Sequence, residues 1–151
     1  MSLANFLERA AVLGCEVTVT EMSESTHTAA EAAAAVGYPV AAIVKSLLFT
    51  ADGEPLLLLV SGPNRVDIDH VSAELGATVA MADAKSVKAI TGYSIGGVPP
   101  FGHNVPIRTV IDADLLALDE VWAAAGSARA VFPIAPGRLV ELASATVASV
   151  R

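Results

Sequence analysis

Lys45 is the charged residue whose place in the sequence points most directly to chemistry. The stretch IVKSLLF reads as a strand, and side-chain alternation along a strand puts Lys45 on one face with Ile43, Leu47 and Phe49. An ammonium group among apolar side chains is unfavourable unless it finds a partner or gives up its proton. Lys45 is therefore a candidate for binding an anion in a pocket. The alternative is an edge-strand lysine that reaches water and discourages aggregation.

A second candidate is the loop TGYSIGGVPPFGHNVPI at residues 91–107, which is longer than an ordinary connection. Its glycines can adopt dihedrals that other residues avoid and let a ligand approach the bare backbone, whereas Pro99 and Pro100 restrict the chain. Exposed N–H groups there could hold a carbonyl oxygen or an oxyanion. The alternative is a surface turn. The loop contains neither a GK[ST] phosphate motif nor a dinucleotide-binding G-x-G-x-x-G motif.

Other reactive side chains are scattered. The sequence has no Ser/His/Asp or Cys/His constellation, and its Asp and Glu residues read as helix caps and surface charges. His103 follows the loop and is a candidate acid or base, with an exposed loop histidine as the alternative. Together with His27 and His70 it makes no metal-ligand pattern, so we expect no metal and no cofactor.

Composition limits the class of protein. The chain has 151 residues, enough for one domain spanning 1–151, and a net charge of −7 that argues against binding duplex DNA. Its apolar runs are shorter than the roughly 20 residues of a membrane-spanning helix, so we expect no membrane association. The N-terminal stretch lacks the pattern of a secretory signal, and the lone Cys15 agrees with a reducing compartment. We expect a cytoplasmic protein.

Local patterns predict alternating helices and strands, and hence an α/β or α+β domain with a mixed sheet. Thr28 and Asp83 are expected to cap helices, and Asp52-Gly53 is expected to form a hairpin turn. Residues 118–134 fit either a helix or a hairpin centred on Gly126. The predicted helices cover residues 3–13, 28–36, 66–75 and 83–91 and a segment after 135, and the predicted strands cover 15–22, 43–51, 54–61, 77–82, 106–116 and the end of the chain.

Taken together, IVKSLLF, LLLLVSGPNRVDIDHVSAELG, and TGYSIGGVPPFG followed by VIDADLL resemble the YbaK/prolyl-tRNA synthetase-associated editing domain family, and the resemblance covers nearly the whole chain, from about Val17 to Val150. Members of this family hydrolyse aminoacyl-tRNAs that carry the wrong amino acid. The resemblance implies a free-standing editing protein with an α+β fold, in which helices surround a mixed, partly curled sheet. It also favours the hairpin around Gly126.

The resemblance also implies roles for individual residues. The family's lysine falls on Lys45, which would contact the phosphate or the terminal adenosine of the tRNA acceptor end. Its Gly-x-x-x-Pro loop falls on Gly96 to Pro100, and either Pro99 or Pro100 fills the proline position. The predicted catalytic set is Lys45, Gly96, Gly97, Val98 and Gly102. The predicted substrate-binding set is Thr26, His27, Thr28, Ile43, Leu47, Pro99, Pro100, Phe101 and His103.

An aminoacyl ester is reactive enough that positioning, an aligned water and a neighbouring ribose hydroxyl can replace a side-chain nucleophile. A pocket lined by Ile43, Leu47 and Val98 would admit a small wrong amino acid and exclude a larger correct one. The resemblance implies cysteine, alanine, serine or threonine on tRNA-Pro or a related tRNA, with a synthetase as a candidate partner. The alternative is a module that binds a nucleotide, an aminoacyl-adenylate or the tRNA acceptor end without turnover.

Overall fold

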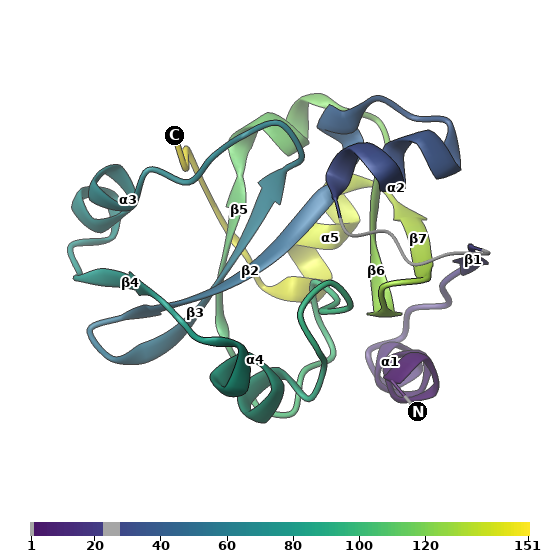
Figure 1. Cartoon of the computed structure of the whole chain (residues 1–151), viewed down its shortest axis with the longest axis horizontal. Coiled ribbons are helices and arrows are strands. Elements are labelled where there is room, and N and C mark those ends of the chain that lie inside the picture. Colours follow the sequence, from purple (N-terminus) through teal and green to yellow (C-terminus); the bar gives the residue numbers. More distant parts are fainter. Residues whose placement is uncertain (1, 23–27) are drawn as a thin grey trace.

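The computed structural model describes residues 2–22 and 28–151, and within them helices alternate with strands (Figure 1). The helices are α1 (Ser2–Val12), α2 (Ala29–Val36), α3 (Ile68–Leu75), α4 (Ala84–Thr91) and α5 (Pro136–Ala143), with 3-10 turns η1 (Val40–Ala42) and η2 (Ala113–Ala117). The strands are β1 (Thr20–Glu21), β2 (Val44–Ala51), β3 (Glu54–Ser61), β4 (Val79–Met81), β5 (Arg108–Asp112), β6 (Val121–Ser127), β7 (Ala130–Ile134) and β8 (Thr146–Ala148).

Polar side chains cap the starts of α2 and α4. The Thr28 hydroxyl accepts a hydrogen bond from the Glu31 amide at 3.1 Å, and Asp83 accepts one from the Ser86 amide at 2.7 Å. Each satisfies an amide that the first helical turn would otherwise leave unpaired. Both predicted caps are confirmed.

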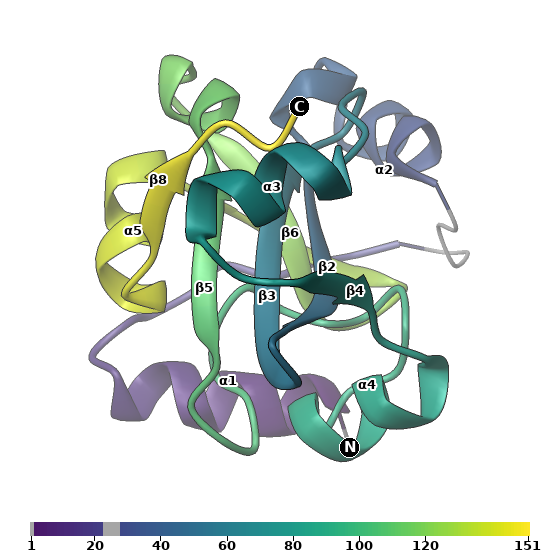
Figure 2. The same ribbon diagram turned by 90° about the vertical axis from the view of Figure 1, so that its left-hand side faces the viewer.

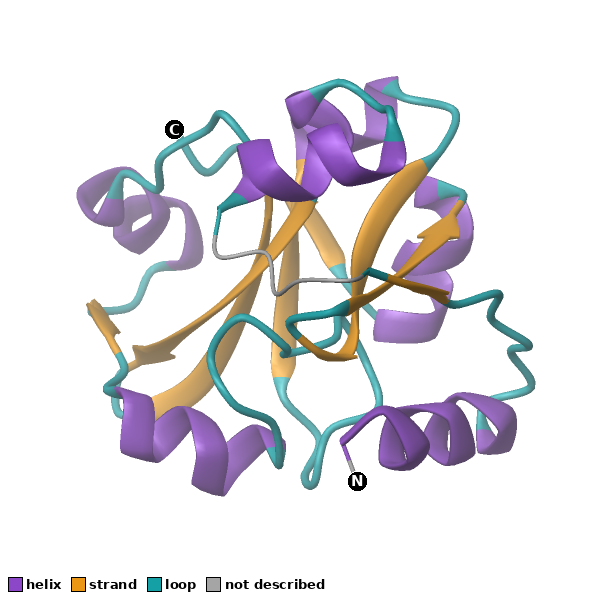
Figure 3. Cartoon of the chain, turned by 45° about the vertical axis from the view of Figure 1, so that its right-hand side comes forward, coloured by secondary structure: helices purple, strands orange, loops and turns teal. Residues whose placement is uncertain are grey.

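Two sheets carry the fold. The larger has the strand order β4-β2-β3-β5-β8, in which β2 pairs antiparallel with β3 and β4, whereas β5 pairs parallel with β3 and β8. The smaller is antiparallel, in the order β1-β7-β6. A single parallel bridge between Ile43 and Trp122 links them. The predicted α+β class with a mixed sheet and surrounding helices is confirmed (Figure 3).

The turn between β2 and β3 follows from local chemistry. Asp52 and Gly53 have φ angles of 51° and 84°, the left-handed pair that a two-residue turn between twisted strands requires. The ambiguous residues 118–134 form the β6–β7 hairpin, as the family resemblance favours. Gly126 itself lies in the irregular register between Ala124 and Ser127, so the turn comes after it.

Two strand predictions need correction. Of residues 15–22 only Thr20–Glu21 forms a strand, because only these two residues pair with β7. Cys15, Val17 and Val19 pack against the core and alternate with exposed residues, so the alternation reflects burial of an extended segment without a partner strand. The strand predicted at 106–116 ends at Asp112, whose side chain accepts a hydrogen bond from the Asp114 amide at 3.0 Å and starts η2.

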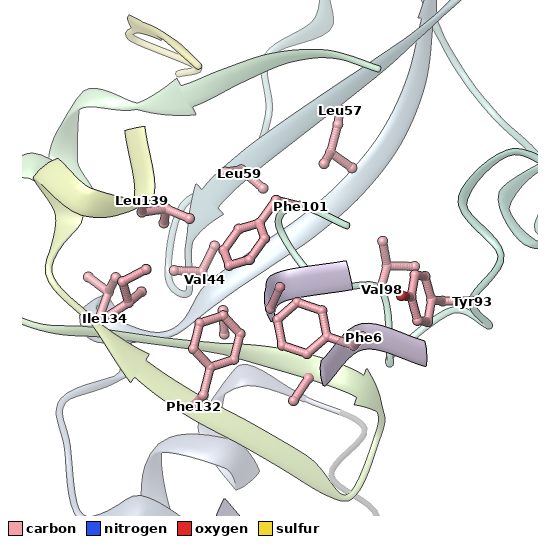
Figure 4. Packing of buried hydrophobic residues seen from close by; sticks show 14 of the residues in the cluster. Phe6, Val44, Leu57, Leu59, Tyr93, Val98, Phe101, Phe132, Ile134 and Leu139 are labelled. Carbon is pink, nitrogen blue, oxygen red and sulfur yellow. The ribbon is translucent and has the colours of Figure 1, made fainter. Parts of the chain in front are cut away.

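The main core lies between the two sheets. Phe6 of α1, Phe101 of the glycine loop and Phe132 of β7 meet there, with ring centroids 5.1 to 5.9 Å apart (Figure 4). Helix α3 covers the other face of the larger sheet, where its Val71 is buried (Figure 2). The larger sheet is thus buried on both faces. Among the described residues, no helix is long and apolar enough to cross a membrane.

Candidate functional site

A gap in the edge of β2 creates the site. Strand β4 pairs with β2 only from Phe49 to Ala51, and the next contact along this edge is the bridge from Ile43 to Trp122. The Leu48 carbonyl accepts a hydrogen bond from the Ala82 amide at 3.3 Å, so it points toward this edge. Since alternate residues of a strand direct their peptide groups to the same side, the peptide groups of Ser46 face the gap.

A cavity of about 460 Å³ occupies this gap. Most of its lining comes from α2, strand β2, the glycine loop and strand β6, and β4, α4 and β7 contribute single residues. Ala32 of α2 and Trp122 of β6 supply apolar surface, and Ile95 of the loop and Met81 of β4 are lining residues that remain 65% and 75% exposed. Exposed apolar side chains at a cavity opening are typical of ligand sites.

The cavity brings together six of the residues predicted from the sequence: Thr28, Ile43, Lys45, Leu47, Gly96 and Val98. Six others do not line it: Gly97, Pro99, Pro100, Phe101, Gly102 and His103. Thr26 and His27 lie outside the described residues. Lys45 shares its face of β2 with Leu47 and Phe49, as alternation predicts, but Ile43 precedes the strand and packs toward α2.

The loop residues behind the cavity hold the loop in place. A Cβ atom added to Gly97 would lie 2.8 Å from the Ser127 Cα atom, closer than real contacts allow. The Gly102 carbonyl accepts hydrogen bonds from Arg9 Nη1 at 3.1 Å and from the Tyr93 hydroxyl at 2.9 Å, which ties the loop to α1. Phe101, 3% exposed, anchors the same loop in the core.

Some amides of the glycine loop donate hydrogen bonds within the protein, and others do not. The Gly97 amide donates to the Ser94 carbonyl at 3.0 Å and closes a tight turn. The amides of Gly96 and Val98 make no hydrogen bond to any described part of the protein. They are therefore the candidate donors for a carbonyl oxygen or an oxyanion in the cavity.

The Lys45 ammonium is held near the start of β2. Its Nζ donates to the Asn64 carbonyl at 2.6 Å. Partial burial lowers the pKa of Lys45 below its ordinary value, the positive charge of Arg65 lowers it further, and the carboxylate of Asp112 opposes both. Such an ammonium is suited to bind an anion that enters from the cavity.

Sequence reasoning missed three polar residues here: Ser46, Asn64 and Asp112. The Ser46 hydroxyl is buried beside the cavity and has no hydrogen-bond partner within the described residues. A buried hydroxyl without a partner is unfavourable, so Ser46 has hydrogen-bonding capacity that the described residues leave unused. A serine next to a strand lysine carries no distinctive signal. What marks Ser46 is the gap it faces, which depends on where β4 ends.

His103 supports the loop from behind the cavity. Its Nε2 lies 2.7 Å from the Pro99 carbonyl oxygen, which can only accept, so Nε2 donates. Burial lowers the pKa of His103, the hydrogen bond to Pro99 opposes that shift, and the charge of Arg9 adds to it. The geometry gives this histidine a place in the loop's structure and no contact with the cavity.

This arrangement predicts a pH-dependent stability. The unfolded chain takes up a proton on His103 near its usual pKa of about 6.5, whereas the folded protein resists until lower pH. The contribution of His103 to the free energy of unfolding is therefore fully present above pH ~6.5 and is lost as the pH falls toward the folded-state pKa. Urea titrations of wild type and His103→Gln at several pH values test this, with His70→Gln as the control for losing an imidazole elsewhere. Parallel pH profiles for wild type and His103→Gln would contradict it.

The cavity lining, as far as the chain is described, contains no Asp, Glu, His or Cys side chain. These residue types also form no group of three that could hold a metal ion within residues 2–22 and 28–151. The polar groups around this apolar space are therefore the Lys45 ammonium, the hydroxyls of Thr28 and Ser46, the Trp122 indole N–H and the amides of Gly96 and Val98. That set can bind an anion and polarise a carbonyl group.

Comparison with known proteins gives consistent matches. Residues 23–142 match the family described as "Aminoacyl-tRNA editing domain". The chain is 31% identical over 133 residues to the uncharacterized protein YwhH of Bacillus subtilis, a match covering 87% of this chain and 85% of that protein. It is 34% identical over 103 residues to the proline–tRNA ligase of Desulfovibrio desulfuricans, covering 68% of this chain but 18% of the ligase.

Solved structures also share the fold of this chain. A crystal structure described as "a putative trans-editing enzyme for prolyl tRNA synthetase" superimposes with a TM-score of 0.94 and 42% identity, over 99% of this chain and 96% of that one. The structure of the hypothetical protein APE2540 gives a TM-score of 0.89 and 33% identity, over 97% and 98% of the two chains.

Proposed function

Because this chain belongs to the aminoacyl-tRNA editing domain family, we propose that it is an aminoacyl-tRNA deacylase, which removes a wrong amino acid from a tRNA. The observation that carries the proposal is the cavity at the β2 edge, which Lys45, Ser46, Gly96 and Val98 line and where the amides of Gly96 and Val98 remain available as donors. The relatives named for proline–tRNA ligase and its trans-editing enzyme support tRNA-Pro as the carrier.

In the proposed reaction, the oxygen of a water molecule adds to the carbonyl carbon of the ester, and the bond from that carbon to the ribose oxygen breaks. The ribose oxygen takes a proton, so the products are a free amino acid and a tRNA with its hydroxyl restored. The amides of Gly96 and Val98 hold the carbonyl oxygen as it gains negative charge. Lys45 binds the phosphate of the terminal nucleotide.

No carboxylate or imidazole lines the described cavity, so proton transfer falls to the substrate's own neighbouring ribose hydroxyl. Positioning then supplies most of the acceleration, because a fixed water and a fixed ester react as if at very high concentration. Ser46 also lines the cavity, and its peptide groups, which face the gap in the β2 edge, can bind the amino or carbonyl group of the aminoacyl moiety.

Selectivity follows from the lining. The cavity wall is apolar and carries several small side chains, those of Ala29, Ala32, Ala123 and Ala124. Such a surface accepts alanine, cysteine, serine or threonine, and each extra methylene changes binding by about 10- to 200-fold at most. The cavity thus acts as a size filter that favours the smallest side chains, such as that of alanine, over the bulkier ring of proline.

The lack of a carboxylate or imidazole in the described lining also favours a second candidate, a module that binds the tRNA acceptor end or an aminoacyl-adenylate without turnover. One experiment separates the two. Wild-type protein is incubated with tRNAs charged with alanine, cysteine, serine, threonine and proline, and both deacylation and binding are measured. Selective hydrolysis of one small aminoacyl-tRNA supports the deacylase. Binding without hydrolysis of any of them supports the binding module and refutes the deacylase.

A further inference from the structure

Asn64 is fixed by nearly all of its polar groups. Its backbone amide donates to the Ser61 carbonyl at 2.9 Å, and its backbone carbonyl accepts the Lys45 ammonium at 2.6 Å. Its side-chain Nδ2 donates both hydrogens, to Asp112 Oδ2 at 2.8 Å and to Asp114 Oδ2 at 2.7 Å. A loop residue held in this way presents its carbonyl to Lys45 in one orientation.

Asp112 is the buried end of this network. It is 1% exposed, and its carboxylate accepts hydrogen bonds from the Ser61 amide at 3.1 Å, from Asn64 Nδ2 and from the Asp114 amide at 3.0 Å. A carboxylate this deep is tolerated only when its oxygens are satisfied. Asp114 is in turn bound by Arg151 Nε at 3.0 Å.

We propose that Asn64 and Asp112 are positioning residues for Lys45: the buried carboxylate fixes the Asn64 side chain, and the Asn64 carbonyl then aims the ammonium at the substrate anion. The proposal rests on the proposed function for the identity of that anion, a phosphate of the tRNA acceptor end. It assigns these two residues a role without contact to substrate.

The charges around Lys45 give the proposal a measurable signature. Arg65, next to Asn64, lowers the pKa of Lys45, and Asp112 raises it, while Asp114 belongs to the same network and is itself paired with Arg151. Replacing Asp112 by the isosteric asparagine removes the charge that raises the pKa. Asparagine also presents a poorer acceptor to Asn64 Nδ2, so the orientation of the Asn64 carbonyl is lost.

The test follows the Lys45 side chain directly by NMR of protein with isotope-labelled lysine. The sequence has three lysines, and Lys85 and Lys88, both exposed on α4, serve as internal references. In Asp112→Asn we expect the pKa of Lys45 to fall further while those of the references do not change. The matched control is Asp67→Asn, because Asp67 is an exposed helix cap outside the network and asparagine caps equally well. An unchanged Lys45 pKa in Asp112→Asn would overturn the proposal.

A second variant covers the case in which Asp112→Asn does not fold. Asn64→Ala keeps the backbone carbonyl but removes the side-chain hydrogen bonds to Asp112 and Asp114. Because residue 64 is only half-buried, the variant should fold. We expect KM for the aminoacyl-tRNA to rise about 10-fold with little change in kcat, since a charged hydrogen bond loses its orientation. Equal KM values for Asn64→Ala and Asp67→Asn would overturn the proposal. If wild type hydrolyses no aminoacyl-tRNA, the proposed function fails. The NMR titration still decides whether Asn64 and Asp112 control the pKa of Lys45.

Discussion

Replacing Lys45 by alanine is expected to lower kcat/KM for deacylation about 10- to 100-fold. The estimate corresponds to one hydrogen bond between charged groups, worth about 1.5–3 kcal/mol. Burial already lowers the pKa of Lys45, so the folded protein gains little stability from this ammonium. The free energy of unfolding should therefore change by no more than about 1 kcal/mol.

Deacylation kinetics and urea unfolding of the same preparations measure both quantities. Lys85→Ala is the control, because it removes one exposed positive charge from α4 and leaves the cavity lining unchanged. If Lys45→Ala and Lys85→Ala have equal kcat/KM, Lys45 does not bind the substrate. A large loss of stability in Lys45→Ala would instead make its role structural.

Filling the cavity is the second change with a large expected effect. Ala32 of α2 lines the cavity and is 7% exposed, so the side chain in Ala32→Leu projects into the space assigned to the amino acid. We expect at least a 10-fold loss of kcat/KM. The loss should be larger for threonyl- than for alanyl-tRNA, because the larger threonine side chain needs more of the space that leucine fills. Rates with the two substrates measure the ratio.

Ala35→Leu tests whether the effect comes from the cavity. Ala35 is exposed on the same helix and does not line the cavity, and the substitution adds the same apolar group there. It should leave the rates with both substrates near wild type. An equal effect of Ala32→Leu and Ala35→Leu, or a threonyl to alanyl ratio unchanged by Ala32→Leu, would place the amino acid elsewhere.

The parts of the site that sequence could predict are those fixed by local rules. Alternation along β2 identified Lys45 because one charge stood out among apolar neighbours, and the clustered glycines identified the loop. Neither rule separates Gly96 from Gly97. The difference depends on the β6–β7 turn, where a Cβ on Gly96 would lie 3.7 Å from the Ala128 Cβ but one on Gly97 would meet the Ser127 backbone.

The hydrogen-bond network that holds Lys45 could not be predicted, because its residues, Asn64 and Asp112, are distant in sequence. Asn64 and Asp112 are 48 positions apart, and they meet only because β3 and β5 pair in parallel. Asp112 reads from sequence as an ordinary surface acid, yet it is buried at the end of β5. Its partners Ser61 and Asn64 lie at the end of the neighbouring strand β3 and just after it. No local sequence pattern predicts that these residues surround Asp112.

The most direct test of the central claim is to locate the aminoacyl end on the protein. A non-hydrolysable amide analogue of alanyl-adenosine is titrated into isotope-labelled protein, and backbone amide shifts are followed by NMR. We predict saturable changes at Ser46, Gly96 and Val98, with none at Gly76 after α3 or at Asp52 in the β2–β3 turn, which do not line the cavity. Changes confined to residues outside the cavity, or no saturable change at millimolar analogue, would contradict the assignment of this cavity as the editing site.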